Sequence, residues 1–513
     1  MIFATIHFFI LITSCVFFYY LVPVKYKWCV LLLANTIFYI TNGGRTIVWL
    51  FAVIGTTYLS ARILDQLNVA IKEVPKAEKE KKLQLKKQKK FTVTCTLILC
   101  VGLLYMMKYW NFTISFFPSL PLPRFDFLIP LGLSFFTFQA IGYVIDVYRG
   151  KYAAQKNILK YACFVSFFPQ MIQGPIGRYN ELLLFEENRF SYKNMQYGLQ
   201  LMLLGFIKKL VVADRAAVMV NAIIFDGTPY SGAIVAVGIF FYCIQLYYDF
   251  SGGVDVARGV ATLFGITMAE NFKRPIFATS LADYWRRWHI SLGTWMRDYL
   301  FYSLSLSKPF GKLSKWARKN IKGIVGKIFA TSVATFIVYF IIGVWHGASM
   351  KYVAFGFYNG TLLTLSLIFE SKFVALKKAL HIDDHDIKYK LFCIVRTWGI
   401  IFIGRYLSRA DGLMHALRLL KRTVLDFQPS TLFSTDYLSF GLQPIDFMVI
   451  LSCLLPLLFM EFLQEKGMQI RDTLSEKNLL IQWVAIAVPL FVLVFFGFYN
   501  GDYIASEFIY AQF

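Results

Sequence analysis

The chain has 513 residues, of which 57% are apolar, 18% aromatic and only 16% charged. In a soluble protein about a quarter of the residues are charged. This composition therefore excludes a soluble globular protein and indicates an integral membrane protein. The net charge of +23 is better explained by short basic loops that orient membrane spans than by a nucleic-acid-binding surface.

The N-terminal part begins with an apolar stretch, residues 2–22, that is long enough to cross a bilayer. It lacks the basic start and the small-residue cleavage site of a signal peptide, so we expect a first transmembrane helix. Residues 72–90 then hold nine lysines against three glutamates, and residues 308–327 hold seven lysines and arginines and no acid. Both basic segments are expected on the cytoplasmic face, where they can also touch anionic lipid head groups.

Further apolar stretches follow along the whole chain and predict an all-α protein with about 11 to 13 membrane helices. No linker divides them, so we expect one integral membrane domain over residues 1–513, with N-terminal helices in 1–125, a core in 126–370 and C-terminal helices in 371–513. Two aromatic core segments, residues 130–150 and 167–178, are expected to be scaffold. The second holds two prolines and two glycines, which predicts a broken helix of the kind tolerated where backbone lines a cavity.

Two aspartates interrupt the apolar segment of residues 245–265. Asp249 and Asp255 flank the run Ser251-Gly252-Gly253, which is expected to break or kink a helix between them. Carboxylates at such depth usually pair with a cation, as part of a site or as a purely structural ion pair. The candidate cations are Arg258, Arg274 and Arg286.

A polar block, residues 270–328, lies in the middle of the chain and contains LADYWRRWHISLGTWMRDYL at residues 281–300. This segment predicts one amphipathic helix, capped at its start by Asp283 or Ser280. Its stripe of large side chains comprises Trp285, Trp288, Leu292, Trp295 and Tyr299. A helix lying in the membrane interface explains the tryptophans, but it does not explain why Arg286 and His289 gather beside them. We therefore expect this helix to line a site.

His346 ends an apolar run, in the sequence GVWHGAS. An ionisable group at such a place is a functional candidate, although a lone histidine can also be a structural imidazole bonded to a backbone carbonyl. Gly343 and Gly347 flank the Trp345-His346 pair and permit close approach of a substrate or of another helix.

Other patterns exclude several kinds of chemistry. The HIDDHD run of residues 381–386 lies in a hydrophilic loop where nothing fixes a metal-binding geometry, so no metal site is expected. The eight cysteines contain no C-x-x-C pair and support neither disulfides nor zinc. G-x-S-x-G is also absent, which argues against a nucleophile-elbow hydrolase. The economical role for His346 is then a general base that takes a proton from a hydroxyl attacking a thioester carbonyl, with Arg286 or His289 positioning or stabilising the acyl donor.

Three segments carry a resemblance to a known family: YDFSGGVDVARG, NFKRPIFATSLADYWRRWHISLGTWMRDYLF and GVWHGASMKYVAFGFYNG. They resemble the membrane-bound O-acyltransferase superfamily, and in particular its bacterial branch that acylates cell-envelope polymers. That branch includes the alginate O-acetylation membrane protein, the peptidoglycan O-acetyltransferase membrane component and the teichoic-acid D-alanyltransferase. The pattern of two histidines 57 positions apart, His289 and His346, is the most specific part of the likeness.

The resemblance implies a ring of tilted helices around a central tunnel, with His346 presented to the tunnel and His289 near its donor side. It implies a multi-pass protein of the bacterial inner membrane that moves an acetyl or other short acyl group from a cytoplasmic thioester to an exported polysaccharide. The donor would be acetyl-CoA or an acyl-carrier protein, with no bound cofactor. The implied partners are this donor, the lipid bilayer and an exported esterase-like acyltransferase, without nucleic acid. The residues expected to line the donor or substrate path are Arg286, Trp285, Trp288, Asp249, Trp345 and Asn359.

The chain ends in FIYAQF, similar to the FIYFQF ending found in the same branch. Tyr510 is therefore a candidate acyl relay, and its alternative is an aromatic anchor at the membrane interface. Two other functions stay open at this point. One is D-alanyl transfer to teichoic acid, and the other is a proton-coupled transporter that uses buried histidine and aspartate.

Overall fold

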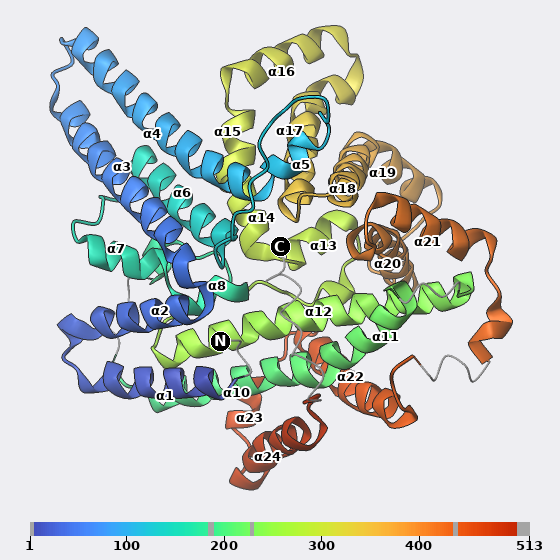
Figure 1. The fold of residues 1–513 in the computed structure, drawn as a ribbon. Helices are drawn as coiled ribbons and strands as arrows, with labels where there is room; N and C mark the ends of the chain where they lie inside the picture. The colour runs from blue at the N-terminus through green and yellow to red at the C-terminus, as the bar shows by residue number, and fades with distance from the viewer. Residues whose placement is uncertain (1–4, 183–188, 226–229, 434–439, 500–513) are drawn as a thin grey trace. The chain divides into compact units, whose positions relative to one another are not determined.

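The computed structural model describes residues 5–182, 189–225, 230–433 and 440–499. Within these ranges the chain is helical, and its one β-type contact is an isolated bridge between Phe272 and Trp288 (Figure 1). The contacts divide the chain into two compact units. The first consists mainly of the residues up to 202 together with 254–269, and the second of 203–253 together with the residues from 270 onward. The prediction of an all-helical protein is confirmed for the described part.

The first unit holds the N-terminal helices. They are α1 (Ile6–Leu21), η1 (Val24–Tyr26), α2 (Lys27–Gly43), η2 (Gly44–Thr46), α3 (Ile47–Glu73), α4 (Lys79–Lys108), α5 (Trp110–Ile114), α6 (Leu133–Arg149), α7 (Ile158–Val165), α8 (Phe168–Gln173), α9 (Tyr179–Leu182) and most of α10 (Tyr192–Phe206). Figure 1 shows α3 and α4 side by side as a long antiparallel hairpin. The last part of α12 also belongs to this unit.

The helix break predicted for residues 167–178 is present, and a buried side chain of α2 satisfies the backbone there. Asn35 donates to the Cys163 carbonyl (3.2 Å) and to Ser166 Oγ (3.1 Å), and its Oδ1 accepts from the Phe168 amide (2.9 Å). A helix end buried without such partners would leave polar backbone groups unpaired. The break between α7 and α8 is therefore a supported structural feature.

The second unit holds the remaining helices. They are η4 (Ile207–Ala213, a π-helical turn), α11 (Asp214–Phe225), α12 (Gly232–Leu263, up to residue 253), η5 (Pro275–Phe277), α13 (Leu281–Arg287), α14 (Ile290–Trp295), η6 (Met296–Phe301, also π-helical), α15 (Tyr302–Ser305), α16 (Lys308–Asn320), α17 (Gly323–Trp345), α18 (Met350–Ile368), α19 (Glu370–Ala379), α20 (Ile387–Arg409), α21 (Leu413–Leu425), η7 (Pro429–Phe433), α22 (Pro444–Glu465), α23 (Ile470–Ser475) and α24 (Leu479–Phe496).

Of the break or kink predicted at Ser251-Gly252-Gly253, the break is absent, because α12 runs through these residues without interruption. A kink there stays a prediction. The glycine serves packing instead: a Cβ atom at Gly252 would lie 2.7 Å from the Gly205 carbonyl oxygen of α10. Glycines also bring α17 and α18 together, since a Cβ atom at Gly356 would lie 2.6 Å from the Phe340 carbonyl oxygen. A side chain at either position would push two helices apart.

Seven helical segments in the described ranges are long and apolar enough to cross a membrane, or up to eight if the bent pair α18–α19 is one span. This number is below the 11 to 13 expected from the apolar stretches. One of the seven, Val24–Glu73, contains both α2 and α3, and other apolar helices such as α1 are shorter than a full span. Short or broken helices of this kind are stable in a bilayer when they are tilted or packed among longer ones.

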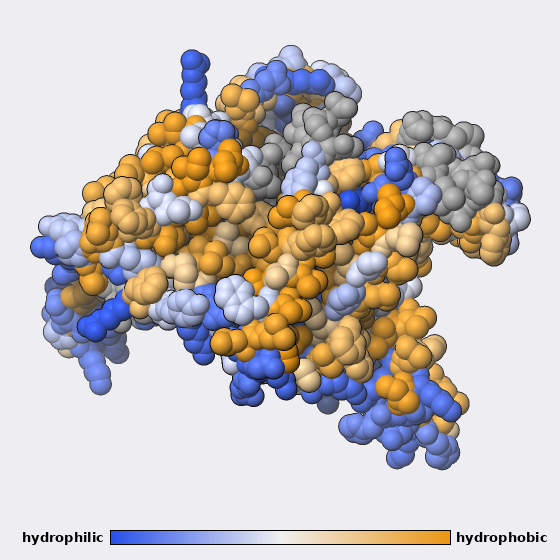
Figure 2. All heavy atoms as spheres, turned by 90° about the horizontal axis from the view of Figure 1, so that it is seen from below, coloured by the Kyte–Doolittle hydropathy of each residue, from blue (hydrophilic) through white to orange (hydrophobic). Residues whose placement is uncertain are grey.

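Apolar side chains cover much of the molecular face drawn in Figure 2. Among the described helices, α24 has no buried residue in its apolar sequence, and α22 and α4 are also largely exposed. So large an exposed apolar surface would aggregate in water. It is the surface expected of helices that face lipid.

Candidate active site

The central polar segment folds back on itself around Asn271 and His289. The Lys273 amide donates to the Arg287 carbonyl (2.9 Å) and the Ile290 amide donates to the Asn271 carbonyl (3.0 Å). Together with the Phe272–Trp288 bridge, these bonds form a short antiparallel clamp. The prediction of one continuous helix over residues 281–300 is therefore wrong, since the chain leaves α13 at Trp288 and enters α14 after His289.

His289 lies at the break in a left-handed backbone conformation, with φ 48°. Positive φ is uncommon outside glycine, although histidine adopts it more often than bulky or β-branched residues. Such conformations persist where the surrounding structure holds them, and they cluster at functional sites. The start of α13 follows the sequence more closely, because Ser280 Oγ accepts from the Asp283 amide (3.1 Å) as the predicted cap.

The ring of His289 is only 2% exposed and lies beside the Asn271 side chain. Asn271 Oδ1 accepts from the Ser291 amide (2.9 Å) and lies 3.3 Å from His289 Nδ1. Because this oxygen is an acceptor, the arrangement places the proton of a neutral imidazole on Nδ1 and leaves Nε2 as the basic nitrogen. Burial lowers the pKa of His289 well below its ordinary value, and the nearby His346 lowers it further. The ring is therefore neutral near neutral pH.

His346 lies at the end of α17, in an aromatic pocket, and is 7% exposed. Its ring centroid lies 5.1 Å from that of Trp345, 6.3 Å from Tyr352 and 6.0 Å from Phe355. The Trp345 indole also lies 6.0 Å from the His289 ring. The structure thus gathers on one tryptophan the two histidines that the sequence singles out.

Two of the predicted tryptophans lie in the walls around this pair. Trp285 is half-buried between Tyr339 (5.8 Å) and Phe355 (6.4 Å). Trp288 is buried, stacks on Tyr284 (5.5 Å) and carries the Arg405 guanidinium 5.2 Å above its ring.

The other two predicted lining residues of this region differ in exposure. Asn359 is buried on α18 and donates to the Phe355 carbonyl (2.9 Å). Arg286 has a side chain 72% exposed and pairs with Asp283 at 3.4 Å. It therefore lies at the surface, whereas the two histidines are enclosed.

Asp249 is buried and forms an ion pair with a lysine that the sequence did not suggest as its partner. Lys209 Nζ, from the π-helical turn η4, lies 2.6 Å from Asp249 Oδ1 and 2.8 Å from Asp214 Oδ1. Asp255 does pair with Arg258, at 4.0 Å. The other candidate cation, Arg274, pairs with Glu465 at 2.7 Å.

Sequence reasoning missed several residues that hold the site in place. Asn271 is distant in the chain from His289, and Lys209 is distant from Asp249, so neither contact follows from local spacing. Arg405 of α20 donates to the Tyr284 hydroxyl, and Arg287 joins Arg274 on the Glu465 carboxylate. The only signal for Asn271 is its place at the head of the NFKRP segment, within the polar block.

Two further predicted features concern the FIYAQF ending and the HIDDHD run. Tyr510 and the rest of the FIYAQF ending lie outside the described residues. The HIDDHD run forms the turn between α19 and α20, where Asp384 accepts from Lys377 at 2.8 Å.

Replacing Asn271 with alanine is expected to reduce catalytic turnover by about ten- to a hundredfold, the effect of losing about 1–3 kcal/mol of buried hydrogen bonding. The change removes the acceptor of the Ser291 amide and the polar neighbour of His289 Nδ1. Steady-state kinetics of the purified chain measure the change in turnover. Asn271→Asp keeps an acceptor oxygen in place, so it should retain more activity than alanine and shift the pH profile. Equal rates for Asn271→Ala and the unchanged chain would contradict this role.

Comparison with known proteins identifies the family. The model of MBOAT, the membrane-bound O-acyltransferase family, matches residues 154–382, which include both histidines. The chain is similar to a probable alginate O-acetylase of Pseudomonas putida, with 32% identity over 327 residues (62% of this chain and 61% of that protein). It is also similar to a probable alginate O-acetylase of Azotobacter vinelandii, with 31% identity over 409 residues (78% and 73%). The teichoic acid D-alanyltransferase of Bacillus subtilis matches with 28% identity over 273 residues (52% and 66%).

These matches differ in how much of each relative they cover. The chain spans 61% of the Pseudomonas putida protein's length, which is less than two thirds. It spans 73% of the Azotobacter vinelandii protein at 31% identity, and the matched region of the family model contains the whole His289 clamp as well as His346. The chain therefore belongs to the membrane-bound O-acyltransferase family.

Proposed function

We propose that the chain transfers an acetyl or other short acyl group from a cytoplasmic thioester to a hydroxyl group, on the way to an exported cell-envelope polysaccharide. The observation that carries this proposal is the buried pair of imidazoles, His289 and His346, which both contact the Trp345 indole. The chain that holds them belongs to an O-acyltransferase family. Neutral imidazole is the commonest general base in proteins. The alginate O-acetylases among the relatives favour acetyl as the acyl group.

In the proposed reaction the acceptor hydroxyl attacks the carbonyl carbon of the thioester. His346 takes the hydroxyl proton as the new C–O bond forms. The C–S bond then breaks, the thiolate leaves, and it receives the proton from His346. The products are an ester and a free thiol, and no oxidant or metal enters the balance. His289, fixed by Asn271, is proposed to position the acyl donor beside His346.

The remaining candidate residues receive separate roles. Trp285, Trp288 and Trp345 are proposed to form the apolar walls of the acyl path, and Asn359 is proposed as a polar residue in the same wall, since all four are buried or half-buried. Arg286, at the surface, suits an encounter with the phosphates of acetyl-CoA or of an acyl-carrier protein. Asp249 is proposed to stabilise the fold around the site through its ion pair with Lys209, without touching the substrate.

Acyl transfer across a membrane explains why such a site belongs to a multi-pass protein. The donor is cytoplasmic and the polysaccharide is outside, so a passage between helices is proposed to let the acyl group cross without the donor. We place the chain in the bacterial inner membrane, with an exported esterase-like acyltransferase as the partner that completes the transfer.

The proposal is tested with purified protein in sealed liposomes. The liposomes receive an acetyl thioester with one label on the acetyl group and another on the thiol part. Release of free thiol, matched by label in an ester on a hydroxyl acceptor, is the expected result. A parallel assay with a D-alanyl thioester should give slower turnover; faster turnover would assign the chain to the D-alanyl reaction instead. Uptake of intact compounds without thiol release would overturn the proposal in favour of a transporter.

Tyr510 is proposed as a relay that accepts the acyl group on its hydroxyl and passes it on. Intact-mass measurement after incubation with the donor should find an acyl adduct in the unchanged chain and none in Tyr510→Phe. An adduct that survives this substitution would exclude Tyr510 as the relay.

A further inference from the structure

The helix α4 changes character sharply at Phe91. Residues 79–90 hold seven lysines and one glutamate, whereas residues 91–107 contain no charged side chain. Both α4 and its neighbour α3 belong to segments long and apolar enough to cross a membrane. The change therefore marks the level at which α4 passes from the lipid head groups into the hydrocarbon region.

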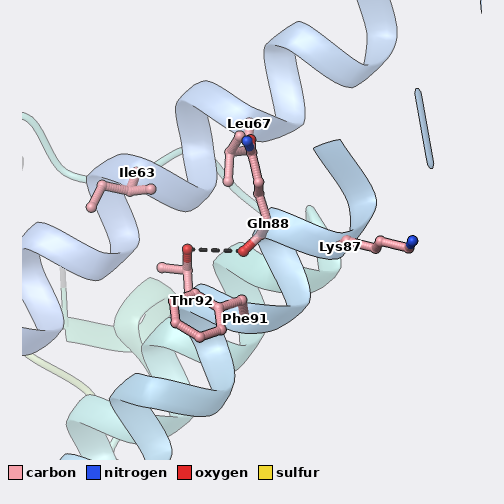
Figure 3. A pocket seen from close by; sticks show the side chains of 6 residues that line it. All are labelled: Ile63, Leu67, Lys87, Gln88, Phe91 and Thr92. Carbon is pink, nitrogen blue, oxygen red and sulfur yellow. Dashed lines mark hydrogen bonds between the residues drawn. The ribbon is translucent and has the colours of Figure 1, made fainter. Parts of the chain in front are cut away.

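An open groove between α3 and α4 lies at this same level (Figure 3). Its volume is about 460 Å³. It is lined by Ile63 and Leu67 of α3 and by Lys87, Gln88, Phe91 and Thr92 of α4. Each helix contributes residues four positions apart, which lie on one helix face. The groove is therefore built from the facing sides of the two helices.

The lining of the groove is mixed, with apolar Ile63, Leu67 and Phe91 beside polar Lys87, Gln88 and Thr92. Phe91 is 71% exposed and Ile63 is 47% exposed, although both are large apolar side chains. Thr92 Oγ1 donates to the Gln88 carbonyl of its own helix (3.0 Å), so this hydroxyl is satisfied internally. Figure 3 shows Lys87 extending outward from the rim, away from Ile63 and Leu67. Its ammonium can therefore reach a charged group above an apolar occupant.

We propose that this groove binds an anionic phospholipid, with an acyl chain against Ile63, Leu67 and Phe91 and the phosphate at Lys87. Charge complementarity favours this occupant, because basic clusters beside membrane helices attract anionic head groups. The depth of the groove favours it over an acidic protein, because its apolar walls continue into the spanning parts of both helices. Its lining residues are not among those proposed to carry acyl transfer, so this proposal does not rest on the proposed function.

The experiment is native mass spectrometry of the delipidated full chain with added phosphatidylglycerol or phosphatidylcholine. Phosphatidylglycerol should bind more tightly than phosphatidylcholine, and Lys87→Gln should weaken it by about fivefold, the effect of one lysine near an anionic surface. Lys90→Gln is the matched control, because it removes the same charge from an exposed position of α4 that does not line the groove. It should have the smaller effect.

A second variant tests the apolar half of the site. Leu67→Trp fills the groove without changing the charge, so it should displace the bound lipid. Inorganic phosphate should not compete, because it lacks an acyl chain. Equal binding of the two lipids, competition by phosphate, or no effect of either Lys87→Gln or Leu67→Trp would each overturn the proposal. Thermal melting of every variant confirms that the chain has folded.

Discussion

Replacing Lys209 with methionine is expected to lower the free energy of unfolding by about 3–5 kcal/mol. The lysine is buried, and its ammonium nitrogen lies 2.6 Å from Asp249 Oδ1 and 2.8 Å from Asp214 Oδ1. Methionine keeps the length of the side chain but removes the charge. Two buried carboxylates then lose a common cation, and a buried charge without its counter-ion is costly. Denaturant unfolding followed by tryptophan fluorescence measures the loss.

A charge-matched variant separates this cause from a change in packing. Lys209→Met combined with Asp249→Asn and Asp214→Asn removes the whole ionic group, so it should recover part of the lost stability. Lys477→Met, at an exposed position, should leave the unfolding midpoint unchanged. If Lys209→Met unfolded at the same denaturant concentration as the unchanged chain, the ion pair would contribute little to the fold.

The ion pair also shows why part of the site was not predictable. Asp249 stands out in the sequence because a carboxylate in an apolar segment needs a partner. The sequence favours as its partner an arginine near it in the chain or in the polar block. Lys209 instead comes from GFIKKL, a segment whose apolar neighbours hide it, and it reaches Asp249 through the π-helical turn η4. Such a pairing depends on how two helices pack, which local sequence does not encode.

Backbone signals had two different outcomes. Proline with glycine in residues 167–178 correctly predicted a broken helix, because proline removes an amide donor and clashes with the preceding turn. Glycines without proline in Ser251-Gly252-Gly253 wrongly predicted a break. A glycine costs a helix only about 1 kcal/mol, and here it lets α12 approach the Gly205 carbonyl of α10. The close packing of α12 against α10 therefore requires a glycine at position 252.

The stripe of aromatic side chains in residues 281–300 wrongly predicted one continuous helix, because the contacts that break it come from elsewhere in the chain. Three- and four-residue spacing is the pattern of a helix, and most of this segment is helical. The break at His289 arises from pairing with residues 271–273. Asn271 precedes His289 by eighteen positions, so helical spacing does not reveal their contact. The two histidines were still identified, because an ionisable group in apolar surroundings stands out from sequence alone. Their common contact with Trp345 could not be predicted from the sequence, because it depends on how the helices pack.

Replacing His346 with glutamine is expected to lower the rate of acyl transfer by about 10²- to 10⁴-fold, the usual contribution of a general base. Glutamine is polar and of similar size, but it cannot take a proton from a hydroxyl at neutral pH. The chain should still fold, since His346 lies at the end of α17 and glutamine can fill much of the space of its ring beside Trp345 and Phe355. The loss should therefore appear in kcat, with the KM for the thioester little changed.

The controls for this substitution separate proton transfer from packing. His385→Gln changes an exposed histidine in the turn after α19 and should have no effect on the rate. His289→Gln should raise the KM for the donor more than His346→Gln does, if His289 positions the thioester. A rate for His346→Gln equal to that of the unchanged chain would refute its role as the base. The proton would then have to pass to His289, whose basic Nε2 is the other imidazole nitrogen available in the enclosed pair.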